Sequence, residues 1–518
     1  MKTKKVFAII LAAIVMSAIA TSCGNASDTE KSVVESSVES AVSEEESKEI
    51  SEEISKSESS VVSETAVSEI SKTESNEENS DRPTPPDGEP NGTPPDKPDG
   101  NGGGPGGAPG GSSADIEYSG AVEITSADTQ KNQTYETNTV DQSALLISTA
   151  DNVTIENMTV NKSGDSNGGD SCNFYGLNAA VLVKDGSTTT ITGGTINSDA
   201  SGANGVFSYG GNGGQNGADG DRTTVIISDT TITTTGSGSG GIMTTGGGIT
   251  KASNLTVTTS GQSSAAIRTD RGGGTVTVDG GTYTSNGLGS PAIYSTADIS
   301  VENATLVSNL SEGMCIEGLN SIKLTNCNLT ANNTKCNGNA TFLDSVMIYQ
   351  SMSGDADSGT SSVTITGGTV TSKNGHIFHV TNTNGVITLS NVKLVNEDSE
   401  NILLSVCSDG WNGGSNIAAL NTSNQELNGT ILVGSDSTLT LNLSDSSTFN
   451  GKIDGNIKNA SGDTVSSEIG SVSVTLDSTS KWTLTGDTYI SEFNGNAENI
   501  VSNGYTLYVN GTALTDIN

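Results

Sequence analysis

The sequence is short of aromatic residues and of positive charge. Aromatic residues make up 4% of its 518 positions and hydrophobic residues 32%, which is too little for a large globular core. It has 23 lysine and arginine residues against 60 aspartate and glutamate residues, a formal net charge of −37. Because phosphate binding relies on clustered basic side chains, this charge argues against nucleic acid as a partner. It also argues against adsorption to anionic lipid through the protein surface.

Histidine is scarcer still, with only His376 and His379 in the chain. In a strand an offset of three residues places two side chains on opposite faces, so we expect no shared metal site and an exposed His379. There is no H-E-x-x-H motif, and the glycine runs lack the lysine of a phosphate-binding loop. Glycine itself is abundant, with 64 residues, which favours one long repetitive body over several globular domains.

The first 22 residues predict export. A basic start precedes an apolar run that is too short for an ordinary spanning helix, as in a secretory signal. Residues 20–23, Ala-Thr-Ser-Cys, resemble a bacterial lipobox, and this resemblance implies cleavage before Cys23 and acylation of its thiol. Ala18-Ile19-Ala20 offers ordinary cleavage as the alternative, so the chain is either anchored to the outer face of the bacterial cell membrane or secreted.

Two segments of low complexity follow the signal. Residues 23–81 are rich in Ser and Glu, and the part from Asp28 to Asp81 has 17 acidic residues against four lysines. Such a segment repels itself and predicts a disordered stalk. Residues 82–113 are rich in Pro and Gly and predict a linker that is extended at first and then flexible. Together they would hold the remainder of the chain away from the cell surface.

One pattern recurs beyond the linker. Residues 275–283, Thr-Val-Thr-Val-Asp-Gly-Gly-Thr-Tyr, read as a strand, a sharp corner and a second strand. Positions equivalent to Val278 are Ile155, Ile191, Ile227, Ala252, Val301, Leu324, Ile365 and Leu389. The residue two positions later tolerates positive φ in every repeat: Asn157, Gly193, Asp229, Asn254, Gly280, Asn303, Asn326, Gly367 and Asn391. The shortest spacing between repeats is 23 residues, which predicts a solenoid coil of that length.

Each coil should contain three strands. The coil around Val278 divides into strands at residues 266–270, 275–279 and 282–285, separated by glycine-rich turns. This pattern resembles right-handed parallel β-helix proteins, both pectate-lyase-like and adhesin-like, over roughly residues 143–400. In style the chain also resembles Gly/Thr-rich bacterial surface lipoproteins. The prediction is an all-β solenoid at residues 114–400, followed by less regular coils and a cap at residues 401–518, with Tyr505 to Val509 closing the C-terminal edge.

The variable spacing of the repeats predicts long loops. Where the spacing exceeds one coil, the extra residues fall at 161–176, 209–222, 330–345 and 350–360. These loops lie on either side of the first strand of each coil, so we expect them to wall a groove over its outer face. The resemblance to β-helix polysaccharide lyases implies a substrate groove on the same face.

The residues of that face can be predicted from the alternation of side chains. Three apolar residues are expected at equivalent inward positions: Ile267, Ile293 and Ile316. Arg268, Tyr294 and Glu317 would then stack outward on successive coils, with Asp270 on the same face. A tyrosine ring between a guanidinium and carboxylates suits a sugar ligand. The alternative interpretation is a solvated ladder of ion pairs beside an ordinary tyrosine.

A catalytic interpretation of the same residues is also open. Arg268 is the candidate base of a polysaccharide lyase, and Asp270 with Asp219 or Asp221 could bind Ca²⁺ through oxygen ligands. Arg222 lies about two coils before Arg268 and Arg271, and the three arginines could share one end of the groove. Aspartates in such loops are also common turn formers, which is the alternative for Asp219 and Asp221.

The cysteines leave two possibilities. If Cys23 is acylated, five cysteines remain, and an odd number in an exported body cannot all pair internally. A bridge from Cys336 to Cys315 or to Cys327 is conceivable, and so are five packed free thiols.

The leading functional hypothesis is a cell-surface-tethered β-helix that binds carbohydrate or another surface, as an adhesin or substrate-capturing module. The alternatives are a polysaccharide lyase and a structural spacer without a ligand. A polysaccharide or cell-surface glycan would be the partner in the first two cases.

Overall fold

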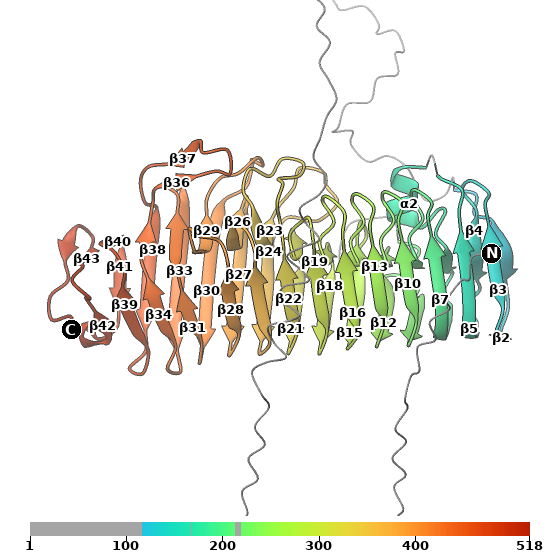
Figure 1. Ribbon diagram of the computed structural model, residues 1–518, viewed down its shortest axis with the longest axis horizontal. Coiled ribbons are helices and arrows are strands. Elements are labelled where there is room, and N and C mark those ends of the chain that lie inside the picture. Colours follow the sequence, from blue (N-terminus) through green and yellow to red (C-terminus); the bar gives the residue numbers. More distant parts are fainter. Residues whose placement is uncertain (1–115, 167, 213–218) are drawn as a thin grey trace, which may run out of the picture. The chain divides into compact units, whose positions relative to one another are not determined.

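The computed structural model describes residues 116–166, 168–212 and 219–518. The predicted signal segment, stalk and linker, including Cys23, lie outside these residues. Within them the chain forms the all-β parallel β-helix that the repeats predict. Figure 1 shows its coils stacking side by side, from the coil of β4 near the N-terminal end to β43 at the C-terminal end.

The first strands of the coils form one parallel sheet, called here the first sheet. Its strands are β1 (Gly120–Ile124), β4 (Ser143–Ser148), β6 (Val181–Lys184), β8 (Val206–Tyr209), β11 (Ile242–Thr245), β14 (Ile267–Thr269), β17 (Ile293–Ser295), β20 (Met314–Glu317), β23 (Asp344–Tyr349), β26 (His376–Thr381), β29 (Ile402–Val406), β32 (Thr430–Val433) and β35 (Ile453–Asp454). Each pairs only with the strands of the coils before and after it, as in other solenoids.

The strands before the corner form a second parallel sheet. They are β2 (Asp128–Lys131), β5 (Asn152–Lys162), β7 (Thr188–Ser198), β9 (Thr224–Ser228), β12 (Gly248–Ser253), β15 (Gly274–Asp279), β18 (Asp298–Glu302), β21 (Ser321–Thr325), β24 (Thr360–Thr366), β27 (Thr383–Ser390), β30 (Asn416–Ser423), β33 (Ser437–Ser444), β38 (Ser471–Leu476) and β41 (Glu492–Asn494). Strands β5 and β7 are long enough to continue through the corner.

The strands after the corner complete each coil. They are β3 (Thr134–Thr137), β10 (Thr231–Thr234), β13 (Thr256–Thr259), β16 (Thr282–Ser285), β19 (Thr305–Ser308), β22 (Asn328–Ala331), β25 (Thr369–Ser372), β28 (Lys393–Asn396), β31 (Glu426–Asn428), β34 (Thr448–Gly451), β39 (Lys481–Leu484) and β42 (Ile500–Val501). The three-stranded coil is therefore confirmed, with strands and turns close to the predicted positions around Val278.

The corner prediction is confirmed at all nine positions. The nine residues have φ between 51° and 71°, the left-handed region that Gly, Asn and Asp tolerate best. The reference residues also pair in the predicted register, for example Ala252 with Val278 and Val278 with Val301. The second and third strands can bury their apolar residues together only because each corner turns the chain sharply.

The coils continue past residue 400 in the same sheets. Strand β27 pairs with β30, and β30 with β33, while corners with φ near 50° recur at Asn424 and Asp445. In these coils Phe449 pairs with Trp482 across β34 and β39. Their rings stack with centroids 5.4 Å apart, and both side chains are buried in the core.

Several further elements lie outside the regular coils. Helix α2 (Asp170–Tyr175) lies in the loop before β6, and the antiparallel pair β36 (Ile457–Lys458) and β37 (Thr464–Ser466) follows β35. The C-terminal end is built from β40 (Thr488–Ile490), β43 (Leu507–Val509) and β44 (Thr512–Ala513), with the short 3₁₀ helix η2 (Ala497–Asn499) before β42. None of the helices in the described ranges is long and apolar enough to cross a membrane.

Candidate functional site

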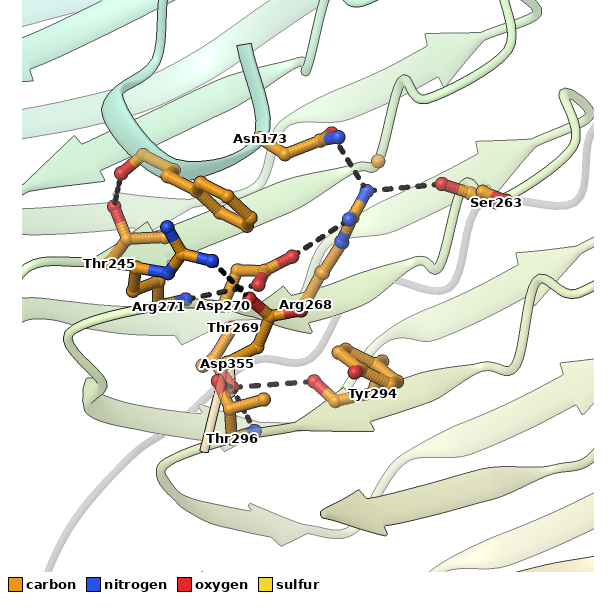
Figure 2. A network of polar contacts seen from close by, with 12 residues as sticks. Asn173, Thr245, Ser263, Arg268, Thr269, Asp270, Arg271, Tyr294, Thr296 and Asp355 are labelled. Carbon is orange, nitrogen blue, oxygen red and sulfur yellow. Dashed lines mark hydrogen bonds and ion pairs between the residues drawn. The ribbon is translucent and has the colours of Figure 1, made fainter. Parts of the chain in front are cut away.

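Arg268 and Asp270 form a buried ion pair on the outer side of the first sheet. Arg268 Nη2 lies 2.8 Å from Asp270 Oδ2, and the two side chains are 11% and 5% exposed. The other guanidinium nitrogen, Nη1, donates to the carbonyl of Ser263 at 3.0 Å and to Asn173 Oδ1 at 3.3 Å (Figure 2). Burial raises the pKa of Asp270 to about 7, although the charge of Arg268 acts in the opposite direction.

Arg271 contacts two loops that are far apart in the chain. Its Nη2 lies 2.6 Å from Asp355 Oδ1, and its guanidinium lies 4.0 Å from the ring centroid of Phe174 in α2. Thr245 Oγ1 also donates to the carbonyl of Phe174 at 2.7 Å. We call Arg268, Asp270, Arg271 and Asp355 the arginine network (Figure 2). It holds the loops of residues 161–176 and 350–360 over the first sheet.

Tyr294 and Glu317 meet in an adjoining buried cluster. Tyr294 Oη donates to Glu317 Oε2 at 2.6 Å, and Tyr349 Oη donates to the same oxygen at 3.1 Å. Ser351 donates to Glu317 Oε1. Burial raises the pKa of Glu317 above its ordinary value, although these hydrogen bonds act to lower it. Burial, followed by the charge of Glu317, raises the pKa of Tyr294 well above its ordinary value.

The predicted stacking of this cluster is wrong by two residues. Tyr294 pairs with Cys315, and Ile293 pairs with Met314 instead of Ile316. Met314 and Ile316 are both apolar and lie on one side of the strand, so alternation alone could not tell them apart. The expected open face is also wrong, since Asp270 and Glu317 are 3% and 1% exposed. The inserted loops fold over this face instead of walling a groove.

This burial bears on the role predicted for Arg268. A base in a lyase must reach a proton of its substrate, but the guanidinium of Arg268 is committed to Asp270, Ser263 and Asn173. In this conformation Arg268 therefore packs against α2 and is not free to act as a base. Sugar binding by Arg268, Asp270, Tyr294 and Glu317 would require these loops to move.

The aspartates predicted to bind calcium are not brought together. Asp221 Oδ1 accepts hydrogen bonds from the backbone N–H and hydroxyl of Thr223, at 2.8 and 2.6 Å, as a turn former does. Asp219 and Arg222 line a cleft of about 760 Å³ beside Gly272–Gly274, and Asp270 does not line it. No three His, Cys, Asp or Glu side chains in the described ranges are grouped as metal ligands.

The two histidines share a partner, contrary to the expectation. His376 Nδ1 and His379 Nδ1 each lie 2.7 Å from Ser405 Oγ, and His379 is fully buried instead of exposed. His376 is the first residue of β26, where strand alternation does not yet fix the direction of a side chain. His379 Nε2 lies 3.4 Å from Asp409 Oδ2. The group has the composition of a hydrolase triad, but Ser405 is fully buried and cannot meet a substrate as it lies.

All five described cysteines are free thiols. Four are buried and Cys336 is partly exposed, and burial raises the pKa of each: Cys172, Cys315, Cys327, Cys336 and Cys407. Packed free thiols, one of the two alternatives, therefore describe this structure.

The exposed aromatic residues gather at the C-terminal end. Tyr489 in β40 pairs with Tyr508 in β43, and their rings stack with centroids 4.6 Å apart at an interplanar angle of 5°. Among the described residues, the exposed large aromatic side chains are Tyr489 and Tyr505, at 50% and 41%. Because Thr488 and Ile490 point into the core, alternation directs Tyr489 outward. We call Tyr489, Tyr505 and Tyr508 the tyrosine platform.

A charged cleft opens on the neighbouring coils. It has a volume of about 510 Å³ and is lined by Leu432, Lys452, Asp454 and Lys458, with hydroxyl side chains of β32 and β37. Lys452 Nζ lies 2.7 Å from Asp454 Oδ2. Burial acts to raise the pKa of Asp454, but hydrogen bonds from Lys452 and Asn456 lower it overall. Strand β35, which carries Asp454, contacts β40, which carries Tyr489.

The sequence contained a signal for this platform. Aromatic residues are only 4% of the chain, yet Tyr489, Tyr505 and Tyr508 fall within 20 positions. The stretch from Tyr505 to Val509 was interpreted only as an edge closure. What the sequence lacked was the pairing of β40 with β43, which brings residues 19 positions apart into one stack.

Comparison of the chain with models of protein families, with curated proteins and with solved structures gave no match.

Proposed function

We propose that this chain is an exported, surface-tethered β-helix that binds glycans, and that the tyrosine platform with its adjoining cleft is the binding surface. The observation that carries the proposal is the exposed Tyr489, stacked on the half-buried Tyr508, beside the paired charges of Lys452 and Asp454. Sugar rings present C–H faces that pack on aromatic rings and hydroxyl groups that bond to charged side chains. The arrangement offers both kinds of contact.

The remainder of the chain is consistent with this role. A lipid anchor at Cys23 followed by an acidic stalk and a Pro/Gly linker would present the solenoid at a distance from the membrane. The platform belongs to the last coils, far along the chain from that anchor. A net charge of −37 keeps such a protein soluble and disfavours nonspecific adsorption to anionic surfaces. The protein would act as an adhesin or as a module that captures a polysaccharide.

The test is retention of the full chain on immobilised polysaccharides, both neutral and acidic. Tyr489→Ala should weaken binding to the retained polymer by roughly 2- to 12-fold, the value of one aromatic contact of about 0.5–1.5 kcal/mol. Tyr489→Phe keeps the ring and should bind like the original chain.

A matched control comes from another exposed apolar side chain. Leu319 is 54% exposed, so Leu319→Ala removes a similar surface contact away from the platform and should leave retention unchanged. If no polysaccharide retains the chain, the glycan-binding function is wrong. If a polysaccharide retains it but Tyr489→Ala binds as tightly as Tyr489→Phe, the function stands and the platform is not its site.

A further inference from the structure

The carboxylate of Asp344 is buried without any partner. Asp344, the first residue of β23, is 1% exposed, and neither of its side-chain oxygens has a hydrogen-bond partner among the described residues. Buried polar groups in folded proteins are nearly always hydrogen-bonded. An ionised carboxylate without a partner costs several kcal/mol to bury. Asp344 must therefore be neutralised, either by a proton or by a bound cation.

Two other polar side chains lie against Asp344. Glu312 is 5% exposed and Asn333 is 1% exposed. Asn333 Nδ2 donates both to Glu312 Oε1 and to the backbone carbonyl of Asp344, at 3.2 Å in each case. The same amide group leaves its own oxygen, Oδ1, buried without a partner. Three buried oxygens therefore lack a donor, both of Asp344 and one of Asn333.

No basic side chain compensates this negative charge. None of the ion pairs between described residues includes Asp344 or Glu312. His376 is the register partner of Asp344 on the next coil, but its Nδ1 bonds to Ser405 and burial lowers its pKa to about 3. Burial, then the charges of Glu312 and Asp409, raise the pKa of Asp344 well above its ordinary value.

We propose that Asp344, Glu312 and Asn333 form a buried binding site for a calcium ion. The donors would be carboxylate and amide oxygens, which are the ligands that Ca²⁺ takes in proteins. Calcium tolerates an irregular arrangement of ligands, whereas magnesium demands a near-ideal octahedron. Only two of the donors are carboxylates and the third is an amide. The site is therefore not one of the groups of three His, Cys, Asp or Glu side chains that the described residues lack.

The site would have a structural consequence. Asn333 belongs to the loop between β22 and β23, while Glu312 precedes β20 and Asp344 begins β23. A calcium ion between them would fasten that loop to two successive coils. It would also neutralise the carboxylates of Glu312 and Asp344, which lie on successive coils joined beside them by the bond from Gly313 N to the carbonyl of Ser345 at 2.8 Å.

The experiment uses the full chain, stripped with a chelator and then equilibrated with Ca²⁺ alone. Elemental analysis should find about one calcium ion per chain, and calcium should raise the thermal midpoint. Asp344→Asn should lose this ion and the calcium-dependent shift. Asp279→Asn, which changes an exposed carboxylate at a corner, is the matched control and should keep both.

A second variant covers the case in which Asp344→Asn does not fold. Asn333→Asp adds a third carboxylate and should lower the apparent Kd for calcium, because ligand charge tunes calcium affinity. Failure of the original chain to retain calcium or to respond to it would overturn the proposal. So would an Asn333→Asp variant that binds calcium no more tightly. Glycan retention is scored separately on the same samples, so that either proposal can fail alone.

Discussion

Replacing Arg268 by alanine should loosen the loops that fold over the first sheet. The guanidinium is 11% exposed and its partner Asp270 is 5% exposed, so the substitution leaves a buried carboxylate with only the backbone N–H of Arg271, at 3.0 Å, as a donor. Breaking a buried pair by removing one partner costs roughly 3–5 kcal/mol. Arg268 also bonds to Asn173 of α2 and to Ser263. The loss of stability should therefore appear first in α2 and its loop.

The size of this loss should depend on pH. Asp270 has a folded-state pKa of about 7, raised above its value of 3.8 in a free chain chiefly by burial. A group with a raised pKa contributes stability below its unfolded pKa and loses it as the pH rises through the folded value. Without Arg268 this pKa rises further, since Arg268 lowers it. At pH 5 Asp270 is neutral with or without Arg268, so the variant loses only the bonds to Asn173 and Ser263. Above pH 7 the additional loss grows by about 1.4 kcal/mol per pH unit until the pKa of Asp270 in the variant is passed.

The assay is hydrogen exchange, because the coils of a solenoid open locally and do not unfold as one unit. Between pH 5 and pH 8 the loss of protection at the amides of α2 and of residues 271–274 should grow by roughly 10-fold, the equivalent of about 1.4 kcal/mol. Arg222→Ala is the control, because Arg222 is exposed and surface changes usually stay within about 0.5 kcal/mol. Equal exchange in the two variants at pH 8 would refute the reasoning.

Three further outcomes are expected. Trp482→Ala should cost roughly 3–5 kcal/mol, because Trp482 is fully buried against Phe449; denaturation followed in the C-terminal coils checks this, and an unchanged midpoint would contradict it. Cys336, the partly exposed thiol, should react with a thiol reagent before the other four described cysteines, as mass spectrometry of digests can test. Burial lowers the pKa of Lys162 to about 8 from 10.5, so stability should rise between these pH values. Lys162→Met should remove that increase in denaturation series.

The repeats were readable from the sequence because their signals are local. Whether Asn303 can adopt φ of 55° depends on its own residue type, and the burial of Val278 and Val301 follows from alternation within one strand. Each corner also sets the register of the coil that follows it. The register predicted for the middle coils therefore also holds in the coils at both ends. The three strands of the coil around Val278 were therefore predicted to within one residue at each end.

The site was not predictable in the same way. Arg268 alternates outward as expected, but only the fold brings Asn173 to Arg268 from 95 residues away and Asp355 to Arg271 from 84 residues away. Glu317 was assigned to the wrong register position because the apolar residues Met314 and Ile316 fit the pattern equally well. The sequence also could not place His376 and His379 on one serine.

The sequence by itself determined the architecture, because strand alternation and left-handed corners depend on residue types that recur in each coil. Only the tertiary structure decided which surfaces remain open. Loops with no repeat of their own cover Arg268, Asp270 and Glu317, and their course depends on contacts between residues far apart in the chain. The same long-range pairing stacks the exposed Tyr489 on Tyr508 and buries Asp344 beside Glu312 and Asn333.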